Sequence, residues 1–135
     1  MSKDLGDRGE AWVADLLRSH GWKIEALQWR CRWGELDLVV SDRQWLVFVE
    51  VKTRSDRNWD IDGTLAITPQ KQAKIIKAAS LFLAENIEKQ PYLHQLACRF
   101  DVALVRHHPR LQRGDQTHLS LEFSLQHYIE EAFLV

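Results

Sequence analysis

Features that mark secreted, membrane-bound or repetitive proteins are scarce in this sequence. The two cysteines, Cys31 and Cys98, lack CxxC spacing and are too few to form a disulfide framework. Apolar runs reach only about five residues, whereas a membrane-spanning helix needs roughly 20. The N-terminal residues are polar and lack the apolar core of a signal peptide. We therefore expect a cytoplasmic protein in a reducing environment.

Net charge is also nearly absent. Lysine and arginine number 18 and aspartate and glutamate 19, so the formal net charge is −1. A uniformly basic surface is therefore excluded, and any nucleic-acid-binding surface must be a local patch. Residues 61–118 are the basic part, with eight Lys and Arg against five Asp and Glu, whereas the last 17 residues contain three Glu and neither Lys nor Arg.

The pattern of apolar residues predicts one α/β domain over residues 1–135. With six Gly, three Pro and no internal repeat, a second domain is not expected. The order α-β-β-β-α-β-β-α describes a mixed β-sheet flanked by helices. The expected elements are a helix over 7–19, strands over 22–33, 35–40 and 45–52, a helix capped by Thr68 and ending near 88, a strand over 96–105, a polar, basic loop over 107–118, a strand over 119–123 and a final helix over 125–133.

Acidic side chains interrupt two strongly apolar strands, 35–40 and 45–52, which a turn at 41–44 joins into a hairpin. Because side chains alternate between the faces of a strand, Glu35 and Asp37 share one face of the first strand. The opposite face of that strand is expected to carry Leu36, Leu38 and Val40.

The expected register of this hairpin brings opposite charges together. A regular turn pairs Val40 with Trp45, which sets Asp37 opposite Phe48 and Glu35 opposite Glu50. Asp37, Glu50 and Lys52 then share one face, with Asp37 diagonal to Glu50.

Two or three carboxylates and an ammonium on one face suit a divalent cation, because closely spaced like charges repel and burial raises the cost. Mg²⁺ prefers oxygen ligands and commonly binds through one or two carboxylates, and it can polarise a phosphodiester. Lys52 could orient water or stabilise charge developing on phosphorus. The hairpin therefore carries the parts of a metal-assisted phosphodiester hydrolase. The structural alternative is a Glu50–Lys52 salt bridge with Asp37 facing solvent.

The spacing of Asp37 and the segment Glu50-Val51-Lys52 resembles the PD-(D/E)xK nuclease signature, with Leu36 in place of the proline. The chain as a whole resembles the YraN family of uncharacterised, Holliday-junction-resolvase-like proteins. The resemblance rests on Gly9-Glu10, the block 34–39, the block 47–54, Ile67-Thr68-Pro69 with Lys71, the block 99–102 and Ala132-Phe133.

That resemblance implies a restriction-endonuclease-like fold and a Mg²⁺- or Mn²⁺-dependent endonuclease. Asp37 and Glu50 would be the metal ligands and Lys52 the catalytic lysine, with Glu10 as a further acidic residue. The substrate would be DNA, with branched or structured DNA as one candidate. Resolution of a junction requires two coordinated cuts, which a symmetric homodimer would supply. The chain departs from the family pattern at Gln28, Trp59-Asp60 and Glu131.

Supporting residues have both functional and structural interpretations. Glu10 also favours the helix dipole, and Glu35 either supports the metal ligands or faces water. Arg54, Arg57 and Lys71 are candidates for binding phosphate.

Other residues of interest lie outside the acidic hairpin. Trp29 and Trp33 alternate with Arg30 and Arg32 and could stack on bases or simply pack. Arg99 and Asp101 are expected to form an ion pair that supports the sheet. Two further functions stay open, an inactive nucleic-acid-binding protein of the same fold and a non-enzymatic interaction protein.

Overall fold

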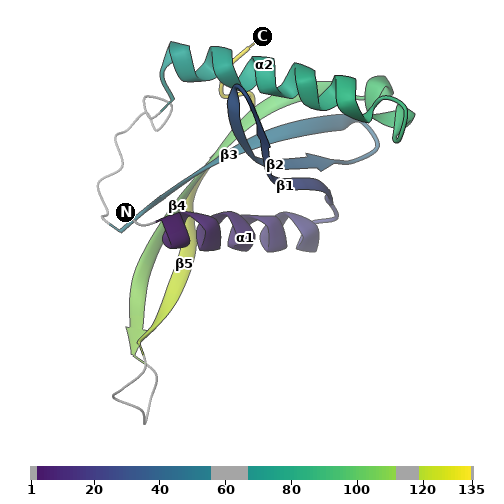
Figure 1. Ribbon diagram of the computed structural model, residues 1–135. Coiled ribbons are helices and arrows are strands. Elements are labelled where there is room, and N and C mark those ends of the chain that lie inside the picture. The colour runs from purple at the N-terminus through teal and green to yellow at the C-terminus, as the bar shows by residue number, and fades with distance from the viewer. Residues whose placement is uncertain (1–2, 56–66, 112–118, 135) are drawn as a thin grey trace.

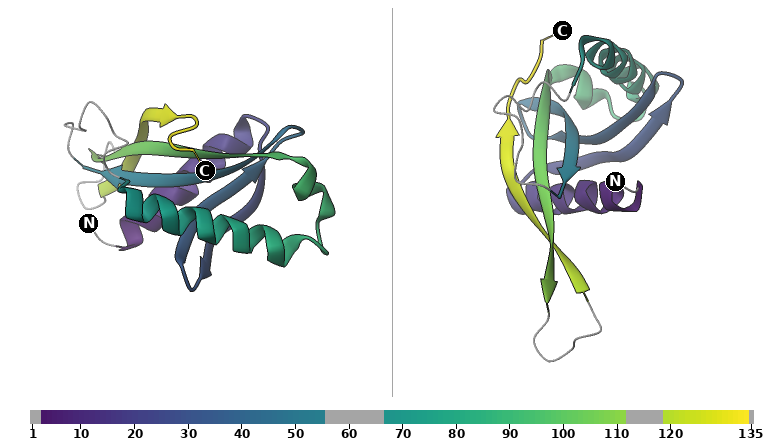
Figure 2. Two further views of the ribbon diagram at one scale, coloured as in Figure 1. Left: turned by 90° about the horizontal axis from the view of Figure 1, so that it is seen from above. Right: turned by 90° about the vertical axis from the view of Figure 1, so that its left-hand side faces the viewer.

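The computed structural model describes residues 3–55, 67–111 and 119–134. Five strands form one sheet in the order β1-β2-β3-β4-β5, in which β3 and β4 are parallel and the other neighbours antiparallel. One helix covers each face of the sheet (Figures 1 and 2). The elements are α1 (Lys3–Ser19), β1 (Lys23–Cys31), β2 (Gly34–Ser41), β3 (Trp45–Arg54), α2 (Pro69–Asn86), the 3₁₀ helix η2 (Pro91–Gln95), β4 (Ala97–Leu111) and β5 (Leu119–Ile129).

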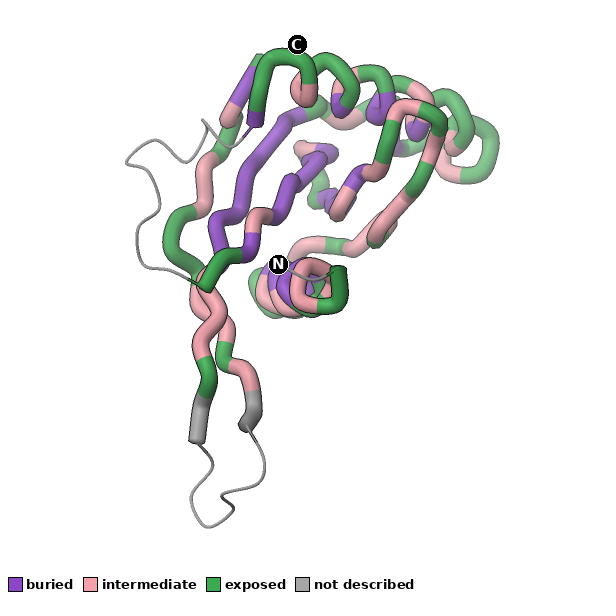
Figure 3. Tube along the Cα trace, turned by 60° about the vertical axis from the view of Figure 1, so that its left-hand side comes forward, coloured by how far each residue is buried: buried purple, intermediate pink, exposed green. Residues whose placement is uncertain are grey.

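The sheet separates two apolar clusters, one beneath each helix. On the α1 side, Val13, Ala14 and Leu17 pack against alternating residues of β2, β3 and β4. On the α2 side, Phe82 packs on Phe48, and the stack continues through Phe100 to Phe133. Buried residues are concentrated in the central strands (Figure 3). None of the helices in the described ranges is long and apolar enough to cross a bilayer.

Helix α2 begins as the sequence predicts. The Thr68 hydroxyl accepts a hydrogen bond of 3.1 Å from the Lys71 backbone N–H, and Pro69 occupies the first turn, where its missing N–H is not needed. Ile75, Ala78, Ala79 and Phe82 face the sheet. The helix ends at Asn86, two residues before the expected end.

The expected final helix over 125–133 is wrong, because β5 continues to Ile129 as an antiparallel partner of β4. Leu104 pairs with His127 and Val105 with Leu125, so a bulge at this point adds one residue to β5. The bulge breaks the two-residue alternation that identifies a strand. The apolar residues then fall at 125, 128 and 129, a spacing that resembles one face of a helix.

The expected loop over 107–118 is also wrong in its first part, since residues 107–111 belong to β4. Its remainder, 112–118, lies outside the described residues. β4 and β5 extend together beyond the helices as a two-stranded arm (Figure 1 and the right view of Figure 2). Hydrogen bonds to the partner strand maintain this segment, so its polar composition does not prevent strand formation.

The hairpin of β2 and β3 has a tighter turn than expected. The Asp42 carboxylate accepts hydrogen bonds from the backbone N–H groups of Gln44 and Trp45, at 2.8 and 2.7 Å. Val40 therefore pairs with Val47, not with Trp45, and Ser41 pairs with Leu46. The predicted register is wrong by two residues. Because side chains alternate with a period of two, this shift preserves the face on which each side chain lies.

Leu36 departs from the expected alternation. It packs in the α2-side cluster, whereas Leu38 and Val40 pack on the α1 side. The ladder between β2 and β3 ends at Leu38 and Val49, and earlier residues of β2 pair with β1 alone. The β1–β2 hairpin rises there beside α2 (Figure 1), so Leu36 joins the cluster beneath that helix.

Candidate functional site

Asp37 lies where β2 separates from β3, one residue beyond the last pair of their ladder. Its Oδ2 atom accepts a hydrogen bond of 2.9 Å from the backbone N–H of Val51. A carboxylate thus replaces the backbone acceptor that a continued ladder would have supplied. This bond holds the Asp37 side chain beside the segment Glu50–Lys52.

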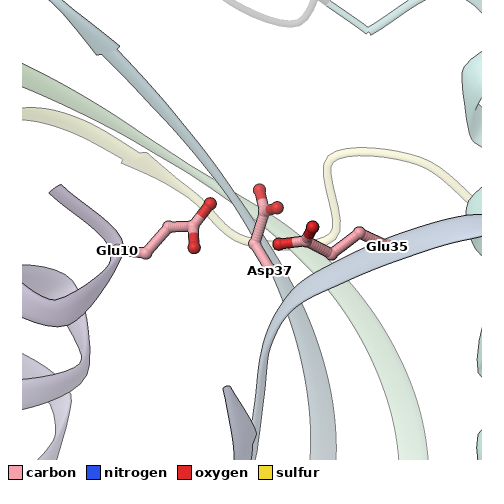
Figure 4. Close-up of side chains that lie close together, drawn as sticks. All are labelled: Glu10, Glu35 and Asp37. Carbon is pink, nitrogen blue, oxygen red and sulfur yellow. The ribbon is translucent and has the colours of Figure 1, made fainter. Parts of the chain in front are cut away.

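Three carboxylates from two elements meet at this point. Glu10 comes from α1, and Glu35 and Asp37 come from β2 (Figure 4). One oxygen from each of the three lies within 4.8 Å of the others, although Arg30 also approaches Glu35 at 3.3 Å. The sequence indicated Glu10 and Glu35 as supporting acids, and the fold brings both of them to Asp37.

Glu50 is the most buried carboxylate of the site, with 2% of its surface exposed. Among the described residues, Lys71 of α2 is the cation that pairs with it, and the Lys71 Nζ atom lies 3.9 Å from Oε2. Burial and the neighbouring Asp37 charge raise the pKa of Glu50 well above its usual range. Glu50 and the three-acid cluster line one pocket of about 410 Å³.

Glu10 is also held in an environment that disfavours its charge. Burial is the main cause, and the charge of Asp37 adds to it, so that the pKa of Glu10 rises to about 8. A hydrogen bond of 2.8 Å donated by the Gln28 amide partly opposes this shift. Glu10 and Glu50 are therefore both harder to ionise beside Asp37 than they would be in water.

Lys52 shows the opposite shift. Its pKa is lowered to about 8, mainly by burial and also by the neighbouring Lys71, while the charges of Glu50 and Asp37 partly oppose the shift. Lys52 and Lys71 line a second pocket of about 660 Å³ together with Glu10 and Asp37. This pocket also contains Arg54 and His107.

A close contact between α1 and β3 sets the position of Glu10. Gly9 lies directly against the Thr53 side chain, and a Cβ atom at Gly9 would overlap the Thr53 hydroxyl. The buried Thr53 Oγ1 has no hydrogen-bond partner among the described residues. Glycine at this position therefore allows the helix to approach closely enough for the next residue, Glu10, to reach Asp37.

Two site residues carry little sequence signal. Gln28 adopts a positive φ of 53°, which places its amide within reach of Glu10, and left-handed geometry is uncommon for glutamine. His107 reaches the pocket because β4 continues past the predicted strand end. Among the phosphate-binding candidates, Arg54 and Lys71 line the pocket, whereas Arg57 lies outside the described residues.

Arg99 and Asp101 form the predicted ion pair, with two contacts of 2.9 Å between buried side chains. The Asp101 carboxylate also accepts hydrogen bonds from the Tyr128 hydroxyl at 2.7 Å and the Glu131 backbone N–H at 3.0 Å. The Arg99 guanidinium lies over the Trp45 ring at 5.1 Å. This network joins β4 to the end of β5 and has a structural role.

A mixed five-stranded sheet with a helix on each face is consistent with a restriction-endonuclease-like fold. The chain belongs to the uncharacterised protein family UPF0102, whose model matches residues 9–105. The matched range contains Glu10, Glu35, Asp37 and Glu50, together with Lys52 and Lys71.

Cyanobacterial relatives match nearly the whole chain. A UPF0102 protein of Synechococcus sp. strain JA-3-3Ab is 47% identical over 131 residues, which cover 97% of this chain and 92% of the relative. A UPF0102 protein of Thermosynechococcus vestitus is 48% identical over 132 residues, covering 97% and 94%. A Nostoc sp. relative is 43% identical over 135 residues, covering 96% and 94%. The similarity therefore extends across the fold as well as the site.

Proposed function

We propose that this chain is a Mg²⁺- or Mn²⁺-dependent endodeoxyribonuclease of the PD-(D/E)xK type, acting in the cytoplasm. One observation carries the proposal. Two adjoining pockets, at the point where β2 separates from β3, are lined by three acids and a lysine: Glu10, Asp37, Glu50 and Lys52. The structural alternative is a Glu50–Lys52 salt bridge with Asp37 facing solvent. It gives no reason for Glu50 to be buried near Asp37, or for Glu10 of α1 to meet Asp37.

The donor set fits a hard divalent cation. Its ligand atoms are carboxylate oxygens, the type that Mg²⁺ and Mn²⁺ prefer, with no cysteine or histidine in the three-acid cluster. Asp37 and Glu50 are the proposed metal ligands, and Glu10 and Glu35 would complete the site. When bound, the ion would offset the repulsion between these acids and polarise the scissile phosphodiester.

The remaining residues would position the substrate and stabilise charge. Lys52 is proposed to orient the attacking water or to stabilise negative charge on the phosphoryl group. Lys71 approaches the site from α2 and Arg54 from the end of β3, and both are suited to hold neighbouring phosphates. If the substrate is a junction, a homodimer would provide the second cut.

Cleavage assays with Mg²⁺ and Mn²⁺ test this proposal on duplex, flap, junction and single-stranded DNA. Native protein should cleave at least one of these substrates, and Asp37→Ala should remove the activity. Asp15→Ala is the matched control, because Asp15 is an exposed acid of α1 that pairs with Arg18. Metal-independent cleavage, or equal cleavage by the Asp37→Ala protein, would contradict the proposal. Binding of DNA without cleavage would favour an inactive nucleic-acid-binding protein.

A further inference from the structure

A third pocket adjoins the acidic site between the β1–β2 hairpin and α2. It has a volume of about 460 Å³ and we name it the Trp33 pocket. Glu35 and Lys71 line both this pocket and the one that contains Glu10, Asp37 and Glu50, so the two form neighbouring parts of one concave surface. Its lining residues include Trp33, Thr68, Gln70, Lys71 and Lys74.

Trp33 lies among cations. The Lys77 ammonium is 4.4 Å from the centroid of its ring and the Arg32 guanidinium is 4.9 Å away. Lys71 and Lys74 line the same pocket from α2. The three lysines are spaced three residues apart, which keeps them near one side of the helix. An aromatic ring is thus placed beside a row of positive charges.

This combination suits one class of ligand, a nucleotide whose base is free to stack. An aromatic ring binds the face of any base, and lysines bind the phosphate that follows it. A base inside a duplex is already stacked on its neighbours and cannot lie against a protein side chain. An uncharged apolar ligand would gain nothing from the lysines.

We propose that the Trp33 pocket holds an unpaired nucleotide next to the scissile phosphodiester, with its base on Trp33 and its phosphate near Lys74 and Lys77. The inference rests on the proposed function for the nature of the ligand. It narrows the substrate to nucleic acid with a single-stranded segment beside the cut, such as a flap, a branch or an open strand. Intact duplex lacks the unpaired base and would bind more weakly.

Binding measured in EDTA tests this inference apart from catalysis. The probes are a short fluorescent oligothymidine, the corresponding oligouridine and a blunt DNA hairpin of similar length. Native protein should bind the single strands more tightly than the hairpin. Trp33→Leu should weaken single-strand binding by about 5- to 100-fold, as expected for loss of one stacked base. It should leave hairpin binding nearly unchanged.

Two further test variants and two controls separate stacking and charge from packing. Trp33→Phe keeps an aromatic face and should retain part of the affinity. Lys77→Gln should reduce the salt dependence of log K by about 0.7, the value for one phosphate contact on a single strand. Lys89→Gln is the matched control, since Lys89 is exposed beyond the end of α2. Trp45→Leu is the control for loss of a tryptophan, because Trp45 is also half-buried but lies at the start of β3, at the opposite end of that strand from Lys52.

The outcomes distinguish this inference from the nuclease proposal. The nucleotide-binding role of the Trp33 pocket would be overturned if both Trp33 variants bound with native affinity. It would also be overturned if Trp33→Leu and Trp45→Leu lost equal affinity. Metal-dependent cleavage is tested separately by its own assay. Equal loss in Trp33→Leu and Trp33→Phe, with lower melting temperatures, would show a packing role and overturn it as well. Binding that depends on Trp33, without cleavage under any metal, would support the pocket and contradict the nuclease. A clear preference for oligothymidine or oligouridine identifies the strand as DNA or RNA.

Discussion

Asp37 accepts a hydrogen bond of 2.9 Å from the backbone N–H of Val51, the residue between Glu50 and Lys52. A side chain of β2 is thereby fixed to the backbone of β3 at the point where their ladder has ended. The backbone of β3 therefore fixes where this carboxylate lies. The Asp37 carboxylate is therefore held beside Glu50 and Lys52 without the help of a cation.

Replacing Asp37 by asparagine should stabilise the metal-free protein. Asparagine can still accept the Val51 hydrogen bond through its carbonyl oxygen, but it removes a charge that raises the pKa of Glu10 and Glu50. We expect a gain in unfolding free energy of about 1 kcal/mol at neutral pH. Thermal unfolding with and without Mn²⁺ measures this, and the metal should stabilise the native protein only. Asp15→Asn is the control, and a lower melting temperature for Asp37→Asn would contradict the expectation.

Stability of the metal-free protein should fall as pH rises from about 4.5 to about 8. Folded Glu10, whose pKa is about 8, keeps a proton that the unfolded chain releases near pH 4.5. Within that window the unfolded state binds fewer protons, so stability declines by up to about 1.4 kcal/mol per pH unit. Glu50, with its raised pKa, contributes in the same direction.

Lys52 reverses this trend at higher pH. Its folded pKa of about 8 lies below the usual 10.5, so the unfolded chain binds more protons between these values and stability rises with pH. Urea unfolding over pH 5–10 should therefore show a minimum near pH 8. Glu10→Gln should flatten the acidic limb, and the exposed Glu88→Gln should not. A flat profile in the native protein would contradict both shifts.

Adding a methyl group at Gly9, by the substitution Gly9→Ala, should both destabilise the protein and weaken metal binding. Gly9→Ala places a carbon against the Thr53 hydroxyl, so α1 must move away from β3 and take Glu10 with it. Overpacking of this kind costs about 1–3 kcal/mol. Adding Thr53→Ala should remove most of the conflict and restore both properties. Calorimetric Mn²⁺ titration of the single and double variants measures the coupling, and additive losses would argue against it.

Lys71→Gln should raise the pKa of Lys52. Lys71 lowers the pKa of Lys52 through its charge and a hydrogen bond, so removing it leaves burial opposed by Glu50 and Asp37. Glu50 would lose the cation that pairs with it, and its pKa should rise further. NMR titration of labelled lysine side chains reports the first effect directly. Lys89→Gln serves as the control, and an unchanged Lys52 titration would contradict the contact between the two lysines.

Asp101 should matter for stability and little for the metal. Asp101→Ala leaves the buried Arg99 charge without its partner, which typically costs about 3–5 kcal/mol. The surface pair of Asp15 and Arg18 offers a direct contrast, because its loss should cost less than about 1 kcal/mol. Urea unfolding compares the two variants, and Mn²⁺ affinity in the folded Asp101→Ala protein should match the native value.

The shared face of Asp37, Glu50 and Lys52 could be predicted because strand alternation survives an error of two residues in register. The tighter turn at Asp42 depends on one side chain accepting two backbone hydrogen bonds, which the apolar pattern does not encode. The meeting of Glu10 with Asp37 is a tertiary contact, and only the family resemblance indicated it. Its enabling feature is the absence of a side chain at Gly9.

The C-terminal error has a different physical origin. A one-residue bulge opposite Leu104 changes the spacing of apolar residues in β5, and a single sequence provides no sign of where a bulge falls. Leu36 lies on the opposite face from the expected one for a related reason, because alternation assumes a strand that stays in the plane of one sheet. The β1–β2 hairpin leaves that plane beyond Leu38.

The parallel pairing of β3 with β4 runs unbroken from Trp45 and Ala97 to Arg54 and Arg106. All the proposed acids precede this closure in the chain, so a ribosome finishes Glu50 long before the strand that flanks it emerges. Long-range parallel contacts of this kind form late. A newly made N-terminal portion would thus hold its carboxylates without the scaffold that aligns them. The proposed nuclease activity would therefore require β4 to have left the ribosome and paired with β3.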